Sequence, residues 1–159
     1  MARVLLPCVA AALVFAVPTS AAAAPDRAVY EASVIALINQ QRATAGVAAL
    51  SEAQELDTAA ERYASVLASG TCFEHTCGPV PQLSDRVDQA GYSGWQAVGE
   101  NIAAGFQTPE AVVAGWMASP GHRANILSTD YSEVGAGFTS SGGKFGMYWA
   151  AEFGTRDGQ

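Results

Sequence analysis

The sequence predicts an α+β fold in a single domain. Its length of 159 residues suits one domain. Apolar residues recur at helical spacing in the first two thirds of the chain, and alternate with small or polar residues near the C-terminus. Helices followed by an antiparallel hairpin are typical of the α+β class. The formal net charge of −7 argues against nucleic acid or an anionic membrane as a partner, because both require clustered cations.

The N-terminus has the pattern of a secretory signal peptide. Arg3 precedes an apolar stretch from Val4 to Val17, shorter than the about 20 residues of a membrane-spanning helix. The alanines at 21–24 resemble a signal-peptidase site. We therefore predict a cleaved signal peptide over residues 1–23, a secreted product and no transmembrane segment; the alternative is a buried N-terminal helix.

The predicted domain organisation follows from this cleavage. Residues 24–33 form a tail and the start of the first helix, 34–154 form the domain, and 155–159 form a C-terminal tail. The first helix is expected at about 29–44, before Gly46. A second helix is predicted after Ser51 and Gln54, which fit a capping box, and it ends at Gly70.

The remaining elements are shorter. Residues 71–83 are expected to form a loop, 84–90 a short helix and 98–104 a strand. Thr108 and Pro109 begin a helix that runs to Met117, before a break at 119–121. Alternating apolar residues at 134–138 and 145–153 predict a hairpin with a turn at 140–143. Its small residues are expected to allow close packing by another layer; they are Gly135, Gly137, Gly146 and Ala150.

Two cysteines remain after signal cleavage. In a secreted protein Cys72 and Cys77 are expected to form a disulfide around His75. The competing interpretation is a metal site made by these two cysteines and His75.

Two further segments carry candidate site residues. Glu100 lies between a glycine and an asparagine on the predicted strand, and His122 follows the sharp turn that contains Ser119. Each residue alone is more often a surface, packing or capping residue.

Together these segments resemble the CAP superfamily, and in particular the bacterial secreted SCP-like domains. The resemblance extends from Val34 to Phe153. It rests on motifs in one order: Asn39-Gln40-Gln41-Arg42, His75, Gly99-Glu100-Asn101-Ile102-Ala103, Trp116 through Leu127, Val134-Gly135-Ala136-Gly137-Phe138 and Tyr148 through Gly154.

The resemblance implies a three-layer α-β-α sandwich with a central antiparallel sheet. It also implies a cleft where two histidines and two acids meet, which holds a divalent cation in some members. His75 and His122 match the two histidines, and Glu100 matches one acid. Ser119 occupies the position of the second acid, so Glu74 and Asp85 are alternative candidates for that role.

These residues predict a binding cleft of His75, Glu100, His122 and Ser119. His75, His122 and Glu100 are a plausible ligand set for zinc or magnesium. The expected function is a non-catalytic extracellular binding or effector protein, with a lipid or a cell-wall component as candidate partners. The alternatives are a metal-dependent peptidase or esterase, and lipid or sterol binding by the apolar residues between Phe106 and Met117. A serine hydrolase that uses Ser119 is less favoured, because no G-x-S-x-G motif is present, and no catalytic residue is assigned.

Overall fold

The computed structural model describes residues 26–70, 72–140 and 142–156. The predicted signal peptide lies outside these residues. The elements, in chain order, are α1 (Arg27–Thr44), β1 (Ser51–Glu52), α2 (Gln54–Ala68), α3 (Leu83–Gln89), β2 (Trp95–Ala104), α4 (Pro109–Ala118), α5 (Pro120–Leu127), β3 (Glu133–Thr139) and β4 (Tyr148–Arg156).

Several helix ends follow from local chemistry. Asp26 caps α1 by accepting a hydrogen bond from the Ala28 amide (3.1 Å), and Gly46 follows its end at a φ of 74°. Thr108 caps α4 in the same way by accepting from the Ala111 amide (3.2 Å), with Pro109 at the first helical position.

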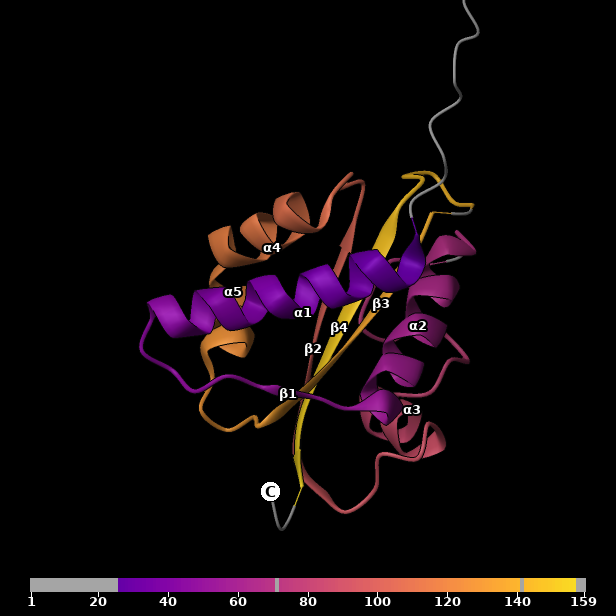
Figure 1. Ribbon diagram of the computed structural model, residues 1–159. Helices are drawn as coiled ribbons and strands as arrows, with labels where there is room; N and C mark the ends of the chain where they lie inside the picture. Colours follow the sequence, from indigo (N-terminus) through magenta and orange to yellow (C-terminus); the bar gives the residue numbers. More distant parts are fainter. Residues whose placement is uncertain (1–25, 71, 141, 157–159) are drawn as a thin grey trace, which may run out of the picture.

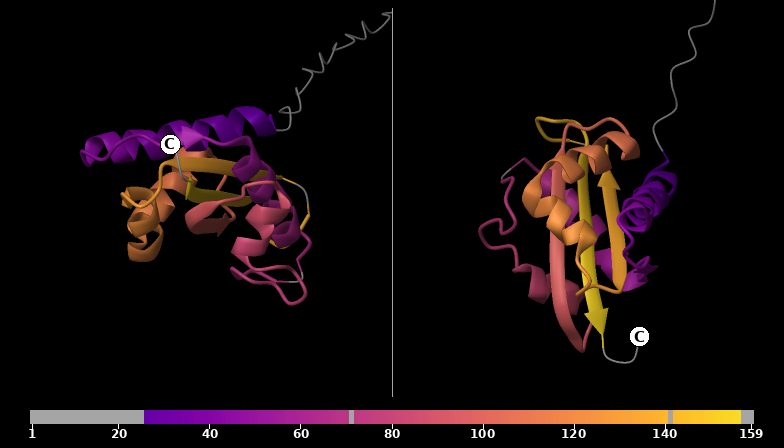
Figure 2. Two further views of the ribbon diagram at one scale, coloured as in Figure 1. Left: turned by 90° about the horizontal axis from the view of Figure 1, so that it is seen from below. Right: turned by 90° about the vertical axis from the view of Figure 1, so that its left-hand side faces the viewer.

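The strands form one sheet in the order β1-β3-β4-β2. The three long strands are antiparallel, and the two-residue β1 pairs with β3 in parallel. Helices α4 and α5 cover one face, where α1 lies along the β3 side and packs on α4, while α2 and α3 cover the other face (Figures 1 and 2). The α+β class and the three layers are confirmed, and β1 makes the sheet mixed.

The core occupies both faces of the sheet. On the α1–α4 side, Trp116, Trp149 and Phe153 are buried with the apolar residues of α1. On the α2 side, Tyr63, Leu67 and Tyr148 are buried together. Gly135 and Gly137 face α2, and a Cβ at either residue would collide with the backbone of that helix. The predicted close packing through these two glycines is confirmed.

The predicted capping box was wrong. Ser51 lies in β1, and α2 begins after Ala53, which makes no side-chain capping bond. The Ala53 amide instead donates to the Val134 carbonyl (3.0 Å). Pairing with β3 therefore draws the segment before α2 into the sheet and away from the helix terminus.

Other boundaries also differ from the prediction. Pro120 begins α5 directly after the break at Ser119, because proline is well suited to the first turn of a helix. Strand β2 begins earlier, at Trp95. Strand β4 begins only at Tyr148, so Gly146 lies in the preceding loop. The strand continues to Arg156, which lies within the predicted C-terminal tail.

Candidate functional site

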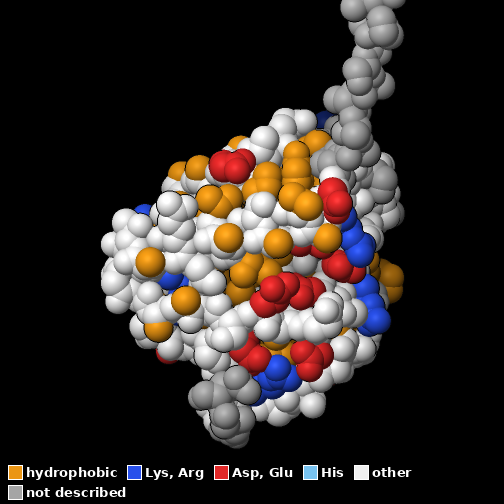
Figure 3. All heavy atoms as spheres, viewed as in Figure 1, with side chains coloured by type: hydrophobic (Ala, Val, Ile, Leu, Met, Phe, Trp, Pro, Cys, Tyr) orange, Lys and Arg blue, Asp and Glu red, His pale blue; other side chains and the backbone are white. Residues whose placement is uncertain are grey.

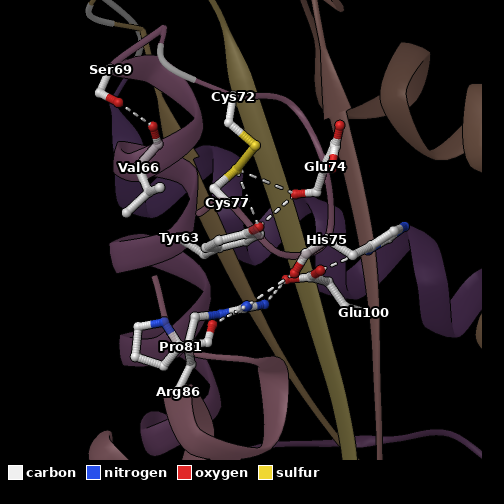
Figure 4. The surroundings of a disulfide bond; sticks show 10 residues. All are labelled: Tyr63, Val66, Ser69, Cys72, Glu74, His75, Cys77, Pro81, Arg86 and Glu100. Carbon is white, nitrogen blue, oxygen red and sulfur yellow. Dashed lines mark hydrogen bonds and ion pairs between the residues drawn. A yellow bond between two sulfur atoms is a disulfide. The ribbon is translucent and has the colours of Figure 1, made fainter. Parts of the chain in front are cut away.

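The loop that carries His75 is fixed at several points. Cys72 and Cys77 form a disulfide, as predicted. The Tyr63 hydroxyl on α2 donates to the Glu74 carbonyl (2.5 Å). Figure 4 shows that these contacts surround the segment from which His75 reaches toward β2. The loop therefore presents His75 from the α2 side of the sheet.

Glu100 orients the imidazole of His75. Its Oε1 lies 2.7 Å from His75 Nδ1, and its Oε2 accepts from the guanidinium of Arg86. The hydrogen bond to this carboxylate raises the pKa of His75 above its ordinary value. One ring nitrogen points at Glu100, and the other points away from it (Figure 4). Because the His75 side chain is 60% exposed, this second nitrogen is available to a ligand.

Arg86 connects this pair to the protein interior. It is buried and donates to the carbonyls of His75 (3.2 Å) and Pro81 (3.1 Å). Its guanidinium carbon lies 3.5 Å from the centre of the Tyr63 ring, a cation–π contact. Arg86 therefore holds the loop, Glu100 and α2 in one arrangement, although its position in the chain carried no functional signal.

Glu152 is a second buried acid beside Glu100. The two residues face each other in the pairing of β2 with β4. Glu152 Oε1 lies 3.6 Å from Arg86 Nη2, and neither carboxyl oxygen has a hydrogen-bond partner among the described residues. Burial, and then the negative charge of Glu100, raise the pKa of Glu152 well above its ordinary value. Both causes favour the neutral form of the Glu152 carboxyl group.

Glu152 had no predicted role. The signal that could have found it is an acidic residue within the apolar run of the last strand, between Ala151 and Phe153. It supplies the second acid near Glu100, but it lies beneath the cleft and does not line it.

His122 reaches the site from the other face of the sheet. It lies in the first turn of α5, and its carbonyl accepts a hydrogen bond from Asn101 Nδ2 (3.0 Å). Asn125 on the same helix donates to the Glu100 carbonyl (3.0 Å) and to Asn101 Oδ1 (2.9 Å). Burial, and then the charge of His75, lower the pKa of His122. These bonds tie α5 to the outer edge of β2.

The two histidines meet in one open cleft that straddles β2, the edge strand of the sheet. The cleft has a volume of about 590 Å³. Its lining residues are Phe73, Glu74, His75, Thr76, Ile102 and His122. An adjoining hollow of about 300 Å³ shares Phe73, Ile102 and His122 with the cleft.

The predicted site residues are only partly brought together. His75 and His122 line the cleft, Ser119 lines the adjoining hollow, and Glu100 lies behind His75. Of the two alternative acids, Glu74 lines the cleft, whereas Asp85 lies on α3 and does not. Of the apolar candidates for a lipid site, Val112, Val113 and Trp116 belong to the core, as is usual for such a helix face, and Phe106 lines the adjoining hollow.

The donor set differs from the predicted three-ligand site. Within residues 26–70, 72–140 and 142–156, no three His, Cys, Asp or Glu side chains are grouped to hold a metal ion. Both Glu100 oxygens are engaged by His75 and Arg86. A carboxylate on one imidazole nitrogen, with the other nitrogen free, is the usual outer-shell arrangement of a metal-binding histidine. The side chains of metal-ligand type that line the cleft are the imidazoles of His75 and His122 and the carboxylate of Glu74.

The chain thus combines three layers around a mixed sheet with a cleft that two histidines line. The chain belongs to the CAP family, described as the cysteine-rich secretory protein family, whose model matches residues 35–153.

Two curated proteins of Bacillus subtilis (strain 168) are similar in sequence. The uncharacterized protein YkwD is 32% identical over 135 residues, which are 85% of this chain and 51% of YkwD. The uncharacterized membrane protein YlbC is 32% identical over 107 residues, which are 67% of this chain and 31% of YlbC. The chain thus spans about half of one relative and a third of the other. Among the described residues, no helix is both long and apolar enough to span a membrane.

Solved structures share the fold. An extracellular protein with an SCP domain from Bacillus anthracis str. Ames has a TM-score of 0.76 and 24% identity, and the match covers 86% of this chain and 45% of that one. An outer surface protein from Borrelia burgdorferi has a TM-score of 0.69 and 21% identity, over 78% of this chain and 90% of that one.

Proposed function

We propose that this protein is an extracellular binding protein of the CAP family and that the cleft over β2 is its ligand site. The observation that carries the proposal is that both histidines of the sequence line one open cleft although they are far apart in the chain. The predicted signal peptide supports an extracellular location, as do the disulfide and the extracellular or surface relatives of the same fold.

A divalent cation is the first ligand that we propose for this cleft. His75, through the nitrogen that faces away from Glu100, and His122 would hold it, with water completing the coordination. A bound cation would polarise an oxygen of a second ligand in the cleft. The part of Glu100 is to orient His75, and Glu74 is the acidic side chain that faces the same cleft.

Calorimetric titration with zinc and magnesium tests the cation site. We expect the wild type to bind zinc at pH 7.5 and the double variant His75→Ala/His122→Ala to release no heat. Glu100→Gln is expected to weaken binding by about 10- to 100-fold, as other outer-shell changes do. Glu74→Gln tests whether the acidic side chain that lines the cleft contributes to zinc binding. Asp85→Asn is its matched control, because Asp85 does not line the cleft. An absence of heat from the wild type with both metals contradicts the cation site.

Zinc affinity should also depend on pH. Because a histidine must be neutral to bind a metal, and the hydrogen bond to Glu100 raises the pKa of His75, protons compete with zinc at this residue. We expect affinity to rise as the pH increases through the titration of His75, with a smaller contribution from His122, whose pKa is lowered. The same titrations at several pH values measure this, and an affinity that stays constant between about pH 5.5 and 8 would contradict histidine ligation.

A hydrolase is the second candidate function. The pKa of His75 is raised and that of His122 is lowered, and such a divergence is typical of an acid and base pair. A panel of ester and peptide substrates, with and without zinc, tests this function. Turnover by the wild type that is lost in His75→Ala/His122→Ala supports hydrolysis, and an equal rate in the two proteins contradicts it.

Lipid or sterol binding is the third candidate. Ile102 and Phe106 line the hollow beside the cleft together with part of the buried Trp116. Saturable uptake of a labelled sterol or fatty acid, reduced in Phe106→Ser, supports this function. Uptake that increases linearly without saturation contradicts it.

A further inference from the structure

Exposed aromatic side chains continue the cleft away from His122. Phe73 and Phe145 are 42% and 47% exposed, and their ring centroids lie 6.2 Å apart in an edge-to-face arrangement. They line a third hollow, of about 190 Å³, together with Lys144 and Tyr148. Phe73 lines this hollow, the cleft and the adjoining hollow, so the three adjoin one another at its side chain, and together they are called the groove below.

The two exposed rings are held in place from below. Both contact the buried ring of Tyr148, whose hydroxyl accepts a hydrogen bond from the Phe145 amide (3.2 Å). Gly143 has a φ of 63°, and a Cβ there would collide with the Tyr148 ring. The disulfide at Cys72 fixes the segment before Phe73. Rings that are already ordered lose little entropy when they bind a partner.

Polar and apolar side chains both line the groove. Phe145, Phe73 and Phe106 supply apolar surface. Its polar side chains are those of Lys144 in the third hollow, Glu74, His75, Thr76 and His122 in the cleft, and Ser119 in the adjoining hollow. Sugars present both kinds of surface, since the C–H faces of their rings are apolar and their hydroxyl groups are polar. A lipid tail, by contrast, is best held by an enclosed and mainly apolar cavity.

Charge distinguishes one end of the groove from the rest of the protein. The chain carries a net charge of −7, and Lys144 is its single lysine. Lys144 Nζ lies 5.5 Å from the centre of the Phe145 ring. No acidic residue is among the described residues that line this hollow. This end therefore complements an isolated anionic group, while the acidic remainder of the protein disfavours a dense polyanion.

We propose that the groove binds a linear polysaccharide with widely spaced carboxylate groups, its sugar rings lying against Phe73 and Phe145 and a carboxylate at Lys144. This inference rests on the proposed function, because it extends the same cleft and names a ligand class for it.

Calorimetry and NMR titration with two defined oligosaccharides test the proposal. A hyaluronan hexasaccharide carries a carboxylate on alternate sugars, and chitohexaose is its uncharged control. We expect saturable binding of the hyaluronan fragment and weaker binding of chitohexaose. Phe73→Ala should weaken both by about threefold to tenfold. Lys144→Gln should weaken only the hyaluronan fragment, by about fivefold at low salt.

Controls separate this inference from the proposed function. Val29→Ala removes an exposed apolar side chain on α1, outside the groove, and should leave both affinities unchanged. Failure of the wild type to bind either sugar overturns the inference, and zinc binding by the same sample would leave the cation site standing. Sugar binding without zinc binding supports the inference and contradicts the proposed cation site. Binding to phosphatidylglycerol vesicles alone overturns it in favour of a lipid surface.

Discussion

Two pairs of buried acids lie in different environments in this fold. Asp57 on α2 and Glu31 on α1 accept hydrogen bonds from the backbone amides of Ala136 and Phe138, each at 2.9 Å. Glu100 and Glu152 are instead paired across β2 and β4 and share Arg86. The first pair accepts hydrogen bonds from backbone amides. In the second pair Glu100 contacts the side chains of His75 and Arg86, and Glu152 lies near Arg86 without a hydrogen bond among the described residues.

The difference shows what each pair does. Strand β1 covers β3 only at Glu133 and Val134, so the next amides of β3 face no neighbouring strand. Asp57 and Glu31 take the place of that strand, which is a structural role, because unpaired buried amides are costly. The acidic side chains around them lie between α1, β1 and α2 on the face drawn in Figure 3, where no histidine is seen. Glu100 and Arg86 instead hold His75, which lines the cleft.

Removing Arg86 should be the strongest way to break the second pair. Arg86→Ala leaves Glu100 without its cation beside another buried acid, and we expect a loss of about 3–5 kcal/mol in the free energy of unfolding. Urea unfolding at pH 7 measures this. Arg123→Ala, an exposed change on α5, is the control and should alter stability little. Adding Glu152→Gln to Arg86→Ala should leave this loss largely unchanged if Glu152 is already protonated. A stability of Arg86→Ala equal to the wild type contradicts the proposed role of the arginine.

The first pair should make stability depend on pH. Burial raises the pKa of Glu31 to about 7 and that of Asp57 to about 6, against the hydrogen bonds from β3. Both values exceed those of the unfolded chain. These two carboxyl groups therefore contribute their whole share of the free energy of unfolding below about pH 4. That share is lost as the pH rises through about 6 and 7, by about 3 kcal/mol for each group at most.

Urea unfolding between about pH 5 and 8 tests this dependence. The neighbouring charged groups are Arg27 on α1, Glu61 on α2 and Glu52 on β1, so Glu31 faces one cation and several acids. Glu31→Gln and Asp57→Asn keep a hydrogen-bond acceptor without the charge and should each flatten the profile. Stability of the wild type that increases with pH across this range contradicts the assignment.

The contrast also explains what the sequence predicted well. Periodicity located the main helices and the last two strands, and ordered motifs located His75 and His122, because these signals are local. The role of Asp57 depends on where β1 stops, and that of Glu152 depends on its pairing with Glu100. Both are consequences of sheet register. Likewise the residues around Ser51 predicted a helix cap, whereas its pairing with β3 places it in β1.

The smallest expected effect is that of Glu152→Gln, and its comparison with Glu100→Gln distinguishes the two acids of the second pair. Burial and the charge of Glu100 favour the neutral form of the Glu152 carboxyl group, so we expect Glu152→Gln to change stability by less than about 1 kcal/mol and to leave the pKa of His75 unchanged. Glu100→Gln removes the charge that both His75 and Arg86 contact, so the pKa of His75 should fall toward its ordinary value. NMR titration of the His75 ring protons measures both. A fall of similar size in the two variants would mean that Glu152 is ionised, and that the pair acts on the cleft as two charges.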